Sequence, residues 1–322
     1  MSPISYQDAG VDLAGAERHV STIAPVVRAT WSDAVIGGFG GFAAGIEMPS
    51  GYRNPVLMMA TDGVGTKLDL ARRSKIWSGV GFDLVAMCVD DLTAVGAEPL
   101  GFVDYMAVGK LDPERDSSIV ASIADACTES GCALLGGETA EHPGVMDPDA
   151  VDLAGAVMGV VEKGEEFGPH RVEAGDVIIG LRSPNLRSNG YSLIRRLFPE
   201  PDRDESLLAG SVIYSKSVLA VAHLVKSAAH ITGGGLPGNL PRAIPPELGV
   251  QLERDSWRPP DIFAEVASRG VASAEMFNTF NMGIGFCVIV APENVGDTVA
   301  GLSQHQARPI GIVTETPGFS II

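Results

Sequence analysis

Short apolar segments alternate with amphipathic segments along most of this chain, and this alternation constrains the fold more than any other feature. In the first half, four short apolar runs are typical of strands, at residues 55–61, 99–108, 132–137 and 151–161. Between the first two runs, residues 78–98 carry apolar side chains at helical spacing. Strands that alternate with helices indicate an α/β or α+β domain.

Residues 112–131 carry the signals of both helix ends. Asp112 is a predicted N-cap, because its side chain can accept hydrogen bonds from the free N–H groups of the first turn. Pro113 suits that first turn, and Gly131 suits the position just past the last turn. The sequence therefore predicts one complete helix here.

The second half of the chain has the same character but does not repeat the sequence of the first. A polar, glycine-bearing stretch at residues 162–176 separates the two halves. We therefore predict an α/β fold of two domains, residues 1–168 and 169–322. In the second domain, strands are predicted at residues 176–183, 283–291 and 309–315, and helices at 211–229 and 259–270.

The charge of the chain argues against two classes of partner. The 322 residues carry a formal net charge of −17 and the pI is near 4.7, whereas binding to nucleic acid or to an anionic membrane requires clustered Lys and Arg. The chain begins without a basic segment followed by an apolar one, and no apolar run approaches the roughly 18 residues of a membrane helix. We expect a cytoplasmic protein with no nucleic-acid or membrane partner.

The cysteines are expected to be buried reduced thiols. Cys88, Cys127, Cys132 and Cys287 lie in apolar surroundings and form no C-x-x-C pair. Such a pattern favours neither zinc ligands nor disulfides.

Glycine clusters follow the apolar runs at five places. Glycine lets backbone amides approach a ligand closely, and consecutive amides can bind an anion. A tight turn explains any single cluster equally well, and the first cluster could also be a flexible arm, but five clusters exceed what turns require. They lie at residues 37–41, 62–67, 136–139, 188–192 and 232–235.

The loop "TDGVGTK" ends the first apolar run with an acid, two glycines and a lysine. It is not a P-loop, because the first glycine of G-x-x-x-x-G-K-[ST] is missing. Carboxylates would repel a phosphate unless a metal ion accompanied it, and their hard oxygens suit Mg²⁺. We therefore expect Asp62 to hold metal, Gly63 and Gly65 to admit phosphate, and Lys67 to neutralise its charge.

Four further acids are candidates for the same site: Asp90, Asp91, Glu138 and, close behind it, Glu141. Asp90 and Asp91 lie in the predicted helix at 78–98, where adjacent side chains point about 100° apart. We expect Asp91 to face inward on the side of Cys88, where a metal would be its partner, and Asp90 to face solvent. Glu138 follows a strand among glycines, and we expect it to serve a site.

Several short strings are typical of one enzyme family. In order along nearly the whole chain they are "SYQDAGVD", "TDGVGTKL", "DLVAMCVDDL", "GAEPL", "DY" and "GKLD" around residues 104 to 112, "GGETAE", "SNGYSL", "HITGGG" and "TFNMGIG". Together they resemble the phosphoribosylformylglycinamidine cyclo-ligases, also called AIR synthetases. Some of them also resemble the wider superfamily, which includes FGAM synthetase, selenophosphate synthetase and thiamine-monophosphate kinase.

This resemblance implies an N-terminal mixed sheet with helices that forms a barrel with a second subunit of a homodimer, and a sandwich-like C-terminal α/β domain. The implied reaction is the ATP-dependent cyclisation of formylglycinamidine ribonucleotide to 5-aminoimidazole ribonucleotide in purine biosynthesis, with ATP and Mg²⁺ as cofactors. Phosphorylation of the formamide oxygen would create a leaving group that the amidine nitrogen displaces, releasing ADP and phosphate. Such a reaction depends on positioning and charge neutralisation more than on covalent catalysis.

The resemblance also assigns three groups of site residues. The catalytic acids that hold Mg–ATP correspond to Asp62, Asp91 and Glu138. The nucleotide contacts correspond to Gly63, Gly65, Thr66, Lys67, Gly136, Gly137 and Thr139. The phosphorylated ribonucleotide is expected at Arg187, Ser188, Asn189, Gly190, Thr232, Gly233, Gly234 and Gly235.

Three positions depart from the usual pattern of this family. Arg187 stands where His usually precedes "SNGYS", Val212 stands where a cation usually precedes "IY", and His142 stands where Met is common. Arg187 could grip the 5′-phosphate and supply the charge that Val212 lacks, or it could be an exposed arginine at a loop tip. Two alternative functions stay open: another ATP-dependent synthetase or kinase of the superfamily, and a non-catalytic nucleotide-binding dimer.

Overall fold

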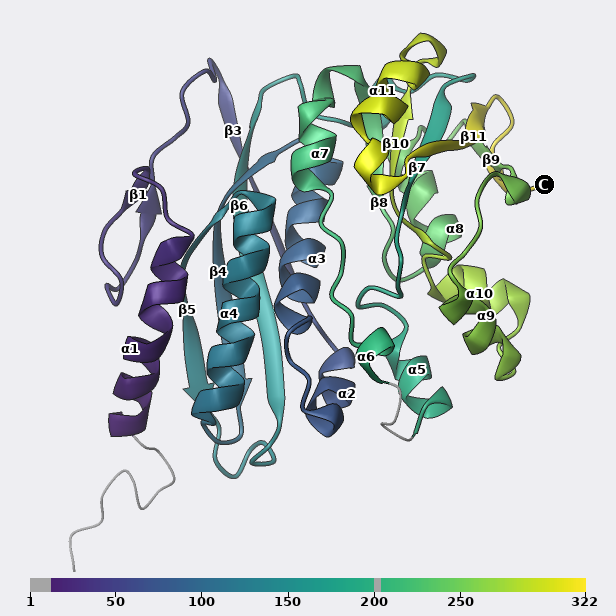
Figure 1. Ribbon diagram of the computed structural model, residues 1–322. Helices are drawn as coiled ribbons and strands as arrows, with labels where there is room; N and C mark the ends of the chain where they lie inside the picture. The colour runs from purple at the N-terminus through teal and green to yellow at the C-terminus, as the bar shows by residue number, and fades with distance from the viewer. Residues whose placement is uncertain (1–12, 200–203) are drawn as a thin grey trace, which may run out of the picture.

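Each half of the chain builds its own sheet and helices. The computed structural model describes residues 13–199 and 204–322, so the string "SYQDAGVD" at residues 5–12 lies outside the described residues. Figure 1 shows the first half on the left and the second half on the right. The two sheets share no strand, which agrees with the predicted α/β architecture.

The first half contains a four-stranded mixed sheet. The strands of the whole first half are β1 (Val35–Ile36), β2 (Gly45–Ile46), β3 (Pro55–Gly63), β4 (Glu98–Val108), β5 (Ala133–Glu141) and β6 (Val151–Glu162). The helices of this half are α1 (Leu13–Ala29), α2 (Lys67–Ser74), α3 (Val80–Ala94) and α4 (Pro113–Ser130). The sheet order is β3-β6-β4-β5, and β1 and β2 form a separate pair. β6 runs antiparallel to both of its neighbours, whereas β4 and β5 run parallel.

Within residues 13–199 and 204–322, helices cover only one face of this sheet. α3 packs on β3, β6 and β4, while α4 and α1 pack on β5 (Figure 1). On the other face, apolar side chains of adjacent strands remain exposed, with Leu57 at 52%, Met59 at 75%, and Val103 and Tyr105 both at 44%. Neighbouring exposed apolar side chains on a sheet face are typical of a surface that binds a further layer.

The helix predicted from its end signals is confirmed as α4. Asp112 accepts hydrogen bonds from the N–H groups of Glu114 and Arg115, each at 3.2 Å. Gly131 follows the helix with a φ of 84°, in the left-handed region that glycine favours. Local chemistry is therefore sufficient to define both ends of this element.

The second half contains a six-stranded sheet in the order β12-β9-β11-β7-β10-β8. All its pairs are antiparallel except the parallel pair of β12 with β9. Its strands are β7 (Val177–Arg182), β8 (Val225–His230), β9 (Gly249–Leu252), β10 (Ile284–Val290), β11 (Arg308–Thr314) and β12 (Gly318–Ile321). Its helices are α5 (Tyr191–Leu197), α6 (Asp204–Leu207), α7 (Ser215–Ala220), α8 (Gly235–Asn239), α9 (Asp261–Ser268), α10 (Ser273–Thr279) and α11 (Val295–Gly301).

The prediction of one long helix at residues 211–229 is wrong. The helix α7 ends at Ala220, and the chain then forms the strand β8. β8 pairs antiparallel with the fully buried strand β10, placing His230 opposite Phe286. Sheet formation in the core therefore overrides a local helical pattern. Besides β8, the elements without a counterpart among the predicted ones are the strands β1, β2, β9 and β12 and the helices α1, α2, α5, α6, α8, α10 and α11.

One hydrophobic core joins the two halves. Leu84 and Val85 of α3 belong to the same buried cluster as Ile194 of α5 and Phe280, which follows α10. All four cysteines are buried and free, as expected. The two halves therefore pack as one body through the helix α3.

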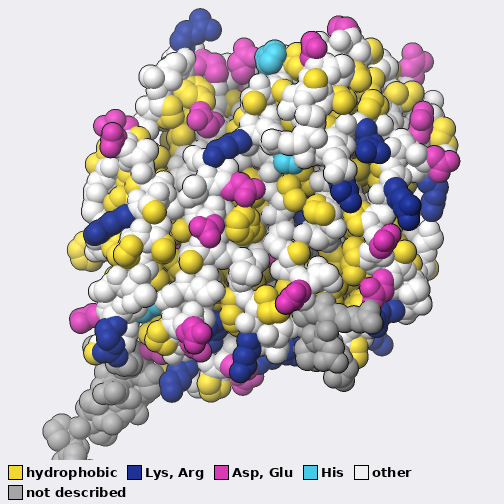
Figure 2. Space-filling view, in the orientation of Figure 1, with side chains coloured by type: hydrophobic (Ala, Val, Ile, Leu, Met, Phe, Trp, Pro, Cys, Tyr) yellow, Lys and Arg dark blue, Asp and Glu magenta, His cyan; other side chains and the backbone are white. Residues whose placement is uncertain are grey.

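Charged side chains are distributed over the surface. Figure 2 shows acidic and basic side chains interspersed with apolar ones on the face that carries α3 and α4. None of the helices in the described part of the chain is both long and apolar enough to cross a membrane.

Candidate functional site

The Asp62 loop lies where β3 leaves the sheet. Asp62 is exposed, and its Oδ1 accepts a hydrogen bond from the N–H of Gly63 at 2.7 Å. Gly65 has a φ of 68°, and a side chain at this position would meet open space. Thr66 precedes α2, and its hydroxyl lies 3.2 Å from that of Ser192. The loop is therefore open to a ligand.

Lys67 does not occupy the place expected of a phosphate contact. Its side chain is fully buried, and its ammonium lies 2.6 Å from Asp83 Oδ2. The ammonium also donates to the backbone carbonyls of Arg187 at 3.0 Å and Ala209 at 2.9 Å. Three acceptors use all three N–H groups of the ammonium. Lys67 is thus an internal cation, and it is not placed to make the expected direct contact with phosphate.

The charges of Lys67 and Asp83 depend on each other. Burial lowers the pKa of the Lys67 ammonium and raises that of the Asp83 carboxyl, and each charge opposes the shift of its partner. Ser211 adds two hydrogen bonds to Asp83 Oδ1, from its N–H at 3.1 Å and its hydroxyl at 2.6 Å. This buried pair therefore connects α2 and α3 to the second half of the chain.

The expected orientations of Asp90 and Asp91 are reversed in the structure. Asp90 is fully buried, and its Oδ1 accepts from the N–H of Tyr214 at 3.0 Å. Asp91 is 47% exposed, and its Oδ1 lies 2.9 Å from Nδ1 of His230. Asp83 and Asp90 are seven residues apart and thus share one face of α3, which packs against the second half.

Arg187 is buried, which contradicts both expected roles for it. Its Nη2 donates to Asp90 Oδ2 at 2.8 Å, and its Nη1 donates to the carbonyl of Gly285 at 3.2 Å. The guanidinium lies 5.1 Å from the ring centre of Tyr214. With no exposed surface, this side chain can neither bind a 5′-phosphate nor be an exposed arginine at a loop tip.

A cleft of about 530 Å³ separates the first sheet from the second. Thr61 of β3 and Asp91 of α3 line one side, and His230, Asn239 and Arg242 line the other. We call this space the interdomain cleft. Its polar groups come from both halves of the chain, so a ligand bound here would contact both.

Asp62 and Asp91 lie near the same buried thiol. Burial raises the pKa of Cys88, and the charges of Asp62 and Asp91 raise it further. Cys88 Sγ lies 3.6 Å from the carbonyl oxygen of Gly155, the residue opposite Asp62 in the sheet, and Asp91 follows Cys88 by three residues on α3. Asp62 and Asp91 form a pair of acids at one end of the first sheet.

Glu138 is separated from this pair. Asp62 and Glu138 lie on β3 and β5, the two edge strands of the sheet. The register aligns Asp62 with Gly155, Asp104 and Gly137 on one face, so Glu138 points to the opposite face. Strands about 4.8 Å apart put the two acids roughly 14 Å from each other. One metal ion cannot contact both within a single chain, and no group of three or more candidate ligands is found among the described residues.

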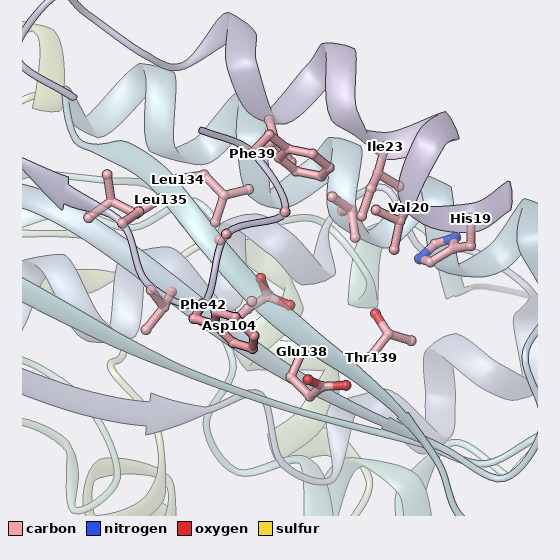
Figure 3. A pocket seen from close by; sticks show the side chains of 18 of the residues that line it. His19, Val20, Ile23, Phe39, Phe42, Asp104, Leu134, Leu135, Glu138 and Thr139 are labelled. Carbon is pink, nitrogen blue, oxygen red and sulfur yellow. The ribbon is translucent and has the colours of Figure 1, made fainter. Parts of the chain in front are cut away.

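A second cavity, of about 550 Å³, lies at the outer edge of β5. α1 forms one wall, the glycine loop at residues 38–44 forms another, and β4 and β5 form the floor (Figure 3). Gly136, Gly137, Glu138 and Thr139 line it. We call it the β5 pocket. A cavity of this size with apolar walls and few polar groups is typical of a small-molecule site.

Asp104 lies in the β5 pocket with an unusual environment for an acid. Its side chain is half-buried and lies over Gly137, where a Cβ would overlap the carboxylate. Burial raises the pKa of Asp104 to about 7, and the nearby charge of Glu138 adds to the increase. Near neutral pH this carboxyl can therefore both donate and accept a hydrogen bond.

The raised pKa of Asp104 predicts a pH-dependent gain in stability for Asp104→Asn. The unfolded chain ionises this group first, near its ordinary pKa of 3.8. The native state therefore loses stability as pH rises from 3.8 to about 7, and its stability does not fall further above pH 7 on account of this group. Removing the charge should raise the free energy of unfolding by about 1–3 kcal/mol at pH 8.5 and by less at pH 5.5, given the partial exposure of the group. Urea denaturation at both pH values measures this, with Asp125→Asn as the control for charge. A gain that is the same at both pH values would contradict the assignment.

The two glycine loops expected at the ribonucleotide, residues 188–190 and 232–235, lie side by side. A Cβ at Gly233 would come 3.6 Å from Asn189 Oδ1. Gly190 and Gly234 have φ values of 78° and 94°, so their backbone conformations favour glycine. Segments more than forty residues apart in the sequence thus form one surface.

Asn239 holds the second of these loops in place and joins it to an arginine. Its Nδ2 donates to the carbonyls of Gly233 at 3.2 Å and Gly235 at 2.8 Å. Its Oδ1 accepts from Arg242 Nη1 at 3.1 Å. Arg242 is exposed and lines the interdomain cleft. A cation therefore stands beside the loops, although it is not the one that the sequence suggested.

Sequence analysis assigned no role to several polar residues of these sites, among them Asp104, His230 and Arg242. Asp104 had a readable signal, because a single acid inside an apolar strand requires a reason. His230 also had one, since it ends a strand directly before a glycine loop. Arg242 had no signal in the sequence, because its position follows from the packing of Asn239 against the glycine loop at residues 232–235.

Comparison with known proteins identifies both halves of the chain. The family model "AIR synthase related protein, N-terminal domain" matches residues 43–161, and the corresponding C-terminal domain matches residues 173–322. The chain is 42% identical to a phosphoribosylformylglycinamidine cyclo-ligase of Parasynechococcus marenigrum, covering 97% of this chain and 96% of that protein. It is 44% identical to one of Oceanobacillus iheyensis, covering 97% of each.

A solved structure of lower identity has the same fold. Hydrogenase maturation protein HypE in complex with ATP matches with a TM-score of 0.66 at 17% identity, covering 93% of this chain and 86% of that one. Near-complete coverage at more than 40% identity decides the family. The chain belongs to the phosphoribosylformylglycinamidine cyclo-ligase family.

Proposed function

We propose that this chain catalyses the ATP-dependent cyclisation of formylglycinamidine ribonucleotide to 5-aminoimidazole ribonucleotide, with release of ADP and phosphate. The observation that carries the proposal is 42–44% identity to cyclo-ligases over 97% of the chain. As a family member, the chain is a ligase of purine biosynthesis, and this role agrees with the cytoplasmic location expected from its sequence.

We assign the β5 pocket to ATP. Gly136, Gly137 and Thr139, which the resemblance marks as nucleotide contacts, all line this cavity. Its apolar walls suit a base, and its glycines leave backbone groups accessible. The fold also supports nucleotide binding, since HypE of the same fold is described in complex with ATP.

We assign a hard divalent cation, Mg²⁺ in the first instance, to Asp62 and Asp91. Both carboxylates are exposed and lie near Cys88, and carboxylate oxygens are the ligands that Mg²⁺ prefers. When bound, the ion would neutralise phosphate charge. Glu138 belongs to the β5 pocket of its own chain, because the sheet separates it from these two acids.

We assign the ribonucleotide to the interdomain cleft and the adjoining glycine loops at 188–190 and 232–235. Arg242 is the cation placed to meet a 5′-phosphate there, since Arg187 is buried. Asp91 and His230 lie opposite it in the same cleft. The chain's contribution to the reaction is to fix the two substrates and to balance charge, and its buried cysteines are not placed for covalent catalysis.

The direct test is an assay with purified protein, Mg–ATP and formylglycinamidine ribonucleotide, following ADP and aminoimidazole ribonucleotide together. Equal amounts of the two products are expected. ADP without aminoimidazole ribonucleotide would indicate another synthetase or kinase reaction, and ATP binding without ADP would indicate a non-catalytic nucleotide-binding protein.

Asp62→Asn and Asp91→Asn should each lower kcat by about 10²–10³-fold or more, the range for removing one group that stabilises transition-state charge. Both residues are exposed, so the melting temperature should change little. Steady-state kinetics at several Mg²⁺ concentrations measure the effect, with Asp125→Asn on α4 as the control. Near-normal activity of Asp91→Asn would remove it from the cation site.

We also propose that residues 1–168 bind ATP and form a homodimer, with residues 169–322 as the second domain. The exposed face of the first sheet carries Leu57, Met59, Val103 and Tyr105, and in one chain no helix covers it in the described part. The same face of a second copy is the natural covering layer, because a two-fold dimer packs one surface against itself.

Met59→Arg should convert the dimer to a monomer at micromolar concentration. Met59 is 75% exposed in one chain, and a guanidinium buried at this position between the two copies would be desolvated without a partner. Sedimentation velocity measures the assembly state. Ile312→Arg, an exposed strand position in the second sheet, is the matched control and should remain dimeric. A wild-type monomer would refute the proposed dimer.

A further inference from the structure

His19 of α1 is a buried histidine without a partner. Its side chain is 2% exposed. Neither Nδ1 nor Nε2 has a hydrogen-bond partner among the described residues. Burying an unpaired polar group is unfavourable, so such a residue requires an explanation.

The groups packed around His19 do not supply the missing partner. The charge that acts on His19 is Asp116 of α4, whose Oδ1 accepts from Arg115 Nε at 2.6 Å and whose Oδ2 accepts from the N–H of Asp112 at 2.8 Å. Burial lowers the pKa of His19, and the charge of Asp116 acts in the opposite direction. A neutral imidazole offers one N–H donor and one acceptor nitrogen.

The position of His19 brings its imidazole to the wall of a cavity. It lines the β5 pocket with Val20 and Ile23 of the same helix. Figure 3 shows the imidazole projecting from α1 toward the strand that carries Thr139, with Asp104 in the same pocket. A molecule in this cavity would therefore reach the orphaned imidazole.

The lining of the β5 pocket favours a flat heteroaromatic ring at this end. Phe39, Leu134 and Ile23 supply apolar surface, and Asp104 can donate or accept a hydrogen bond near neutral pH because its pKa is raised to about 7. Phosphate groups would be repelled here by Asp104 and Glu138. An aminopurine fits, because its ring offers both acceptor nitrogens and an amino donor.

We propose that His19 hydrogen-bonds the adenine of ATP and that, with Asp104, it makes the β5 pocket select adenine over a 6-oxopurine. This inference rests on the proposed use of ATP and goes beyond it by naming the residues that hydrogen-bond the adenine base.

The test is isothermal titration calorimetry with Mg–ATP and Mg–ITP, in which the 6-amino group is replaced by oxygen. His19→Leu should weaken ATP binding about tenfold, equivalent to about 1.4 kcal/mol, and should leave the binding of inorganic tripolyphosphate unchanged. The preference of the wild type for ATP over ITP should fall by a similar factor. His19→Gln, which keeps a donor and an acceptor, should recover part of the affinity, and His305→Leu serves as the control histidine.

Thermal denaturation supplies a second measurement, in which a histidine with a purely structural role would give a different result. Without nucleotide, His19→Leu should raise the melting temperature, because an apolar side chain replaces an unpaired polar one. With saturating ATP, its stabilisation should be smaller than that of the wild type. A structural role would instead lower the melting temperature and leave ATP affinity intact.

Two failures can be told apart. If wild-type protein binds no ATP, the proposed function itself fails. If the wild type binds ATP and cyclises the ribonucleotide while His19→Leu keeps its affinity and its preference over ITP, only the role of His19 is refuted.

Discussion

Lys67→Met is expected to lower the free energy of unfolding by about 3–5 kcal/mol, the range for breaking a buried ion pair from one side. The substitution leaves Asp83 fully buried, with an ionised oxygen that Lys67 contacted at 2.6 Å. It also leaves the backbone carbonyls of Arg187 and Ala209 without their donor. Methionine fills the space but restores none of these interactions.

Urea denaturation of a double-mutant cycle measures this effect. Lys67→Met with Asp83→Asn should be more stable than Lys67→Met alone, because the amide keeps an acceptor for Ser211 and removes the unpaired charge. Arg72→Met, at a partly exposed ion pair in the same helix, should cost only about 0–1 kcal/mol. A loss of nucleotide affinity without loss of stability would instead indicate that Lys67 contacts the phosphate groups.

Arg187→Met should be comparably destabilising, by about 3–5 kcal/mol, because it leaves Asp90 buried and uncompensated. The guanidinium donates to Asp90 at 2.8 Å and to Gly285 at 3.2 Å, and it packs on the ring of Tyr214. Arg187→Met with Asp90→Asn should recover much of the loss, since asparagine can still accept from the N–H of Tyr214.

Kinetics separate this structural role from substrate binding. If Arg187 acts through packing, any residual activity of Arg187→Met should change alike toward ATP and the ribonucleotide, in proportion to the folded fraction. A rise in KM for the ribonucleotide alone, in a protein of normal stability, would show instead that Arg187 reaches the substrate.

Features that depend on local chemistry could be predicted from the sequence. Asp112 and Gly131 determine the ends of α4 through hydrogen bonds and backbone conformation within a few residues. The Asp62 loop was recognised because glycines and an acid at a strand end are visible without knowledge of the fold. The strand β8 was missed because its partner β10 lies more than fifty residues further along the chain.

The burial of the site cations could not be predicted, because it is decided by distant residues. Lys67 meets the carbonyls of Arg187 and Ala209, which are 120 and 142 residues away in sequence. Arg187 meets Asp90 at a separation of 97 residues. The reversal of Asp90 and Asp91 has the same cause, since which face of α3 is covered depends on the second half. Spacing within one helix shows which residues share a face but not what that face contacts.

The placement of Asp83 and Asp90 on one face of α3 has a consequence for how this chain can be divided or recombined. Each acid is neutralised by hydrogen bonds or charges that come wholly or partly from the second half, through Ser211, Tyr214 and Arg187. A fragment that ended between the two halves would expose this helix face, with Asp90 left without its charged partner and Asp83 held by Lys67 alone. The halves are therefore not interchangeable modules. A chimera with another family member would need matching partners for Asp83 and Asp90 in its second half. A substitution of either acid should occur together with a substitution of its partner.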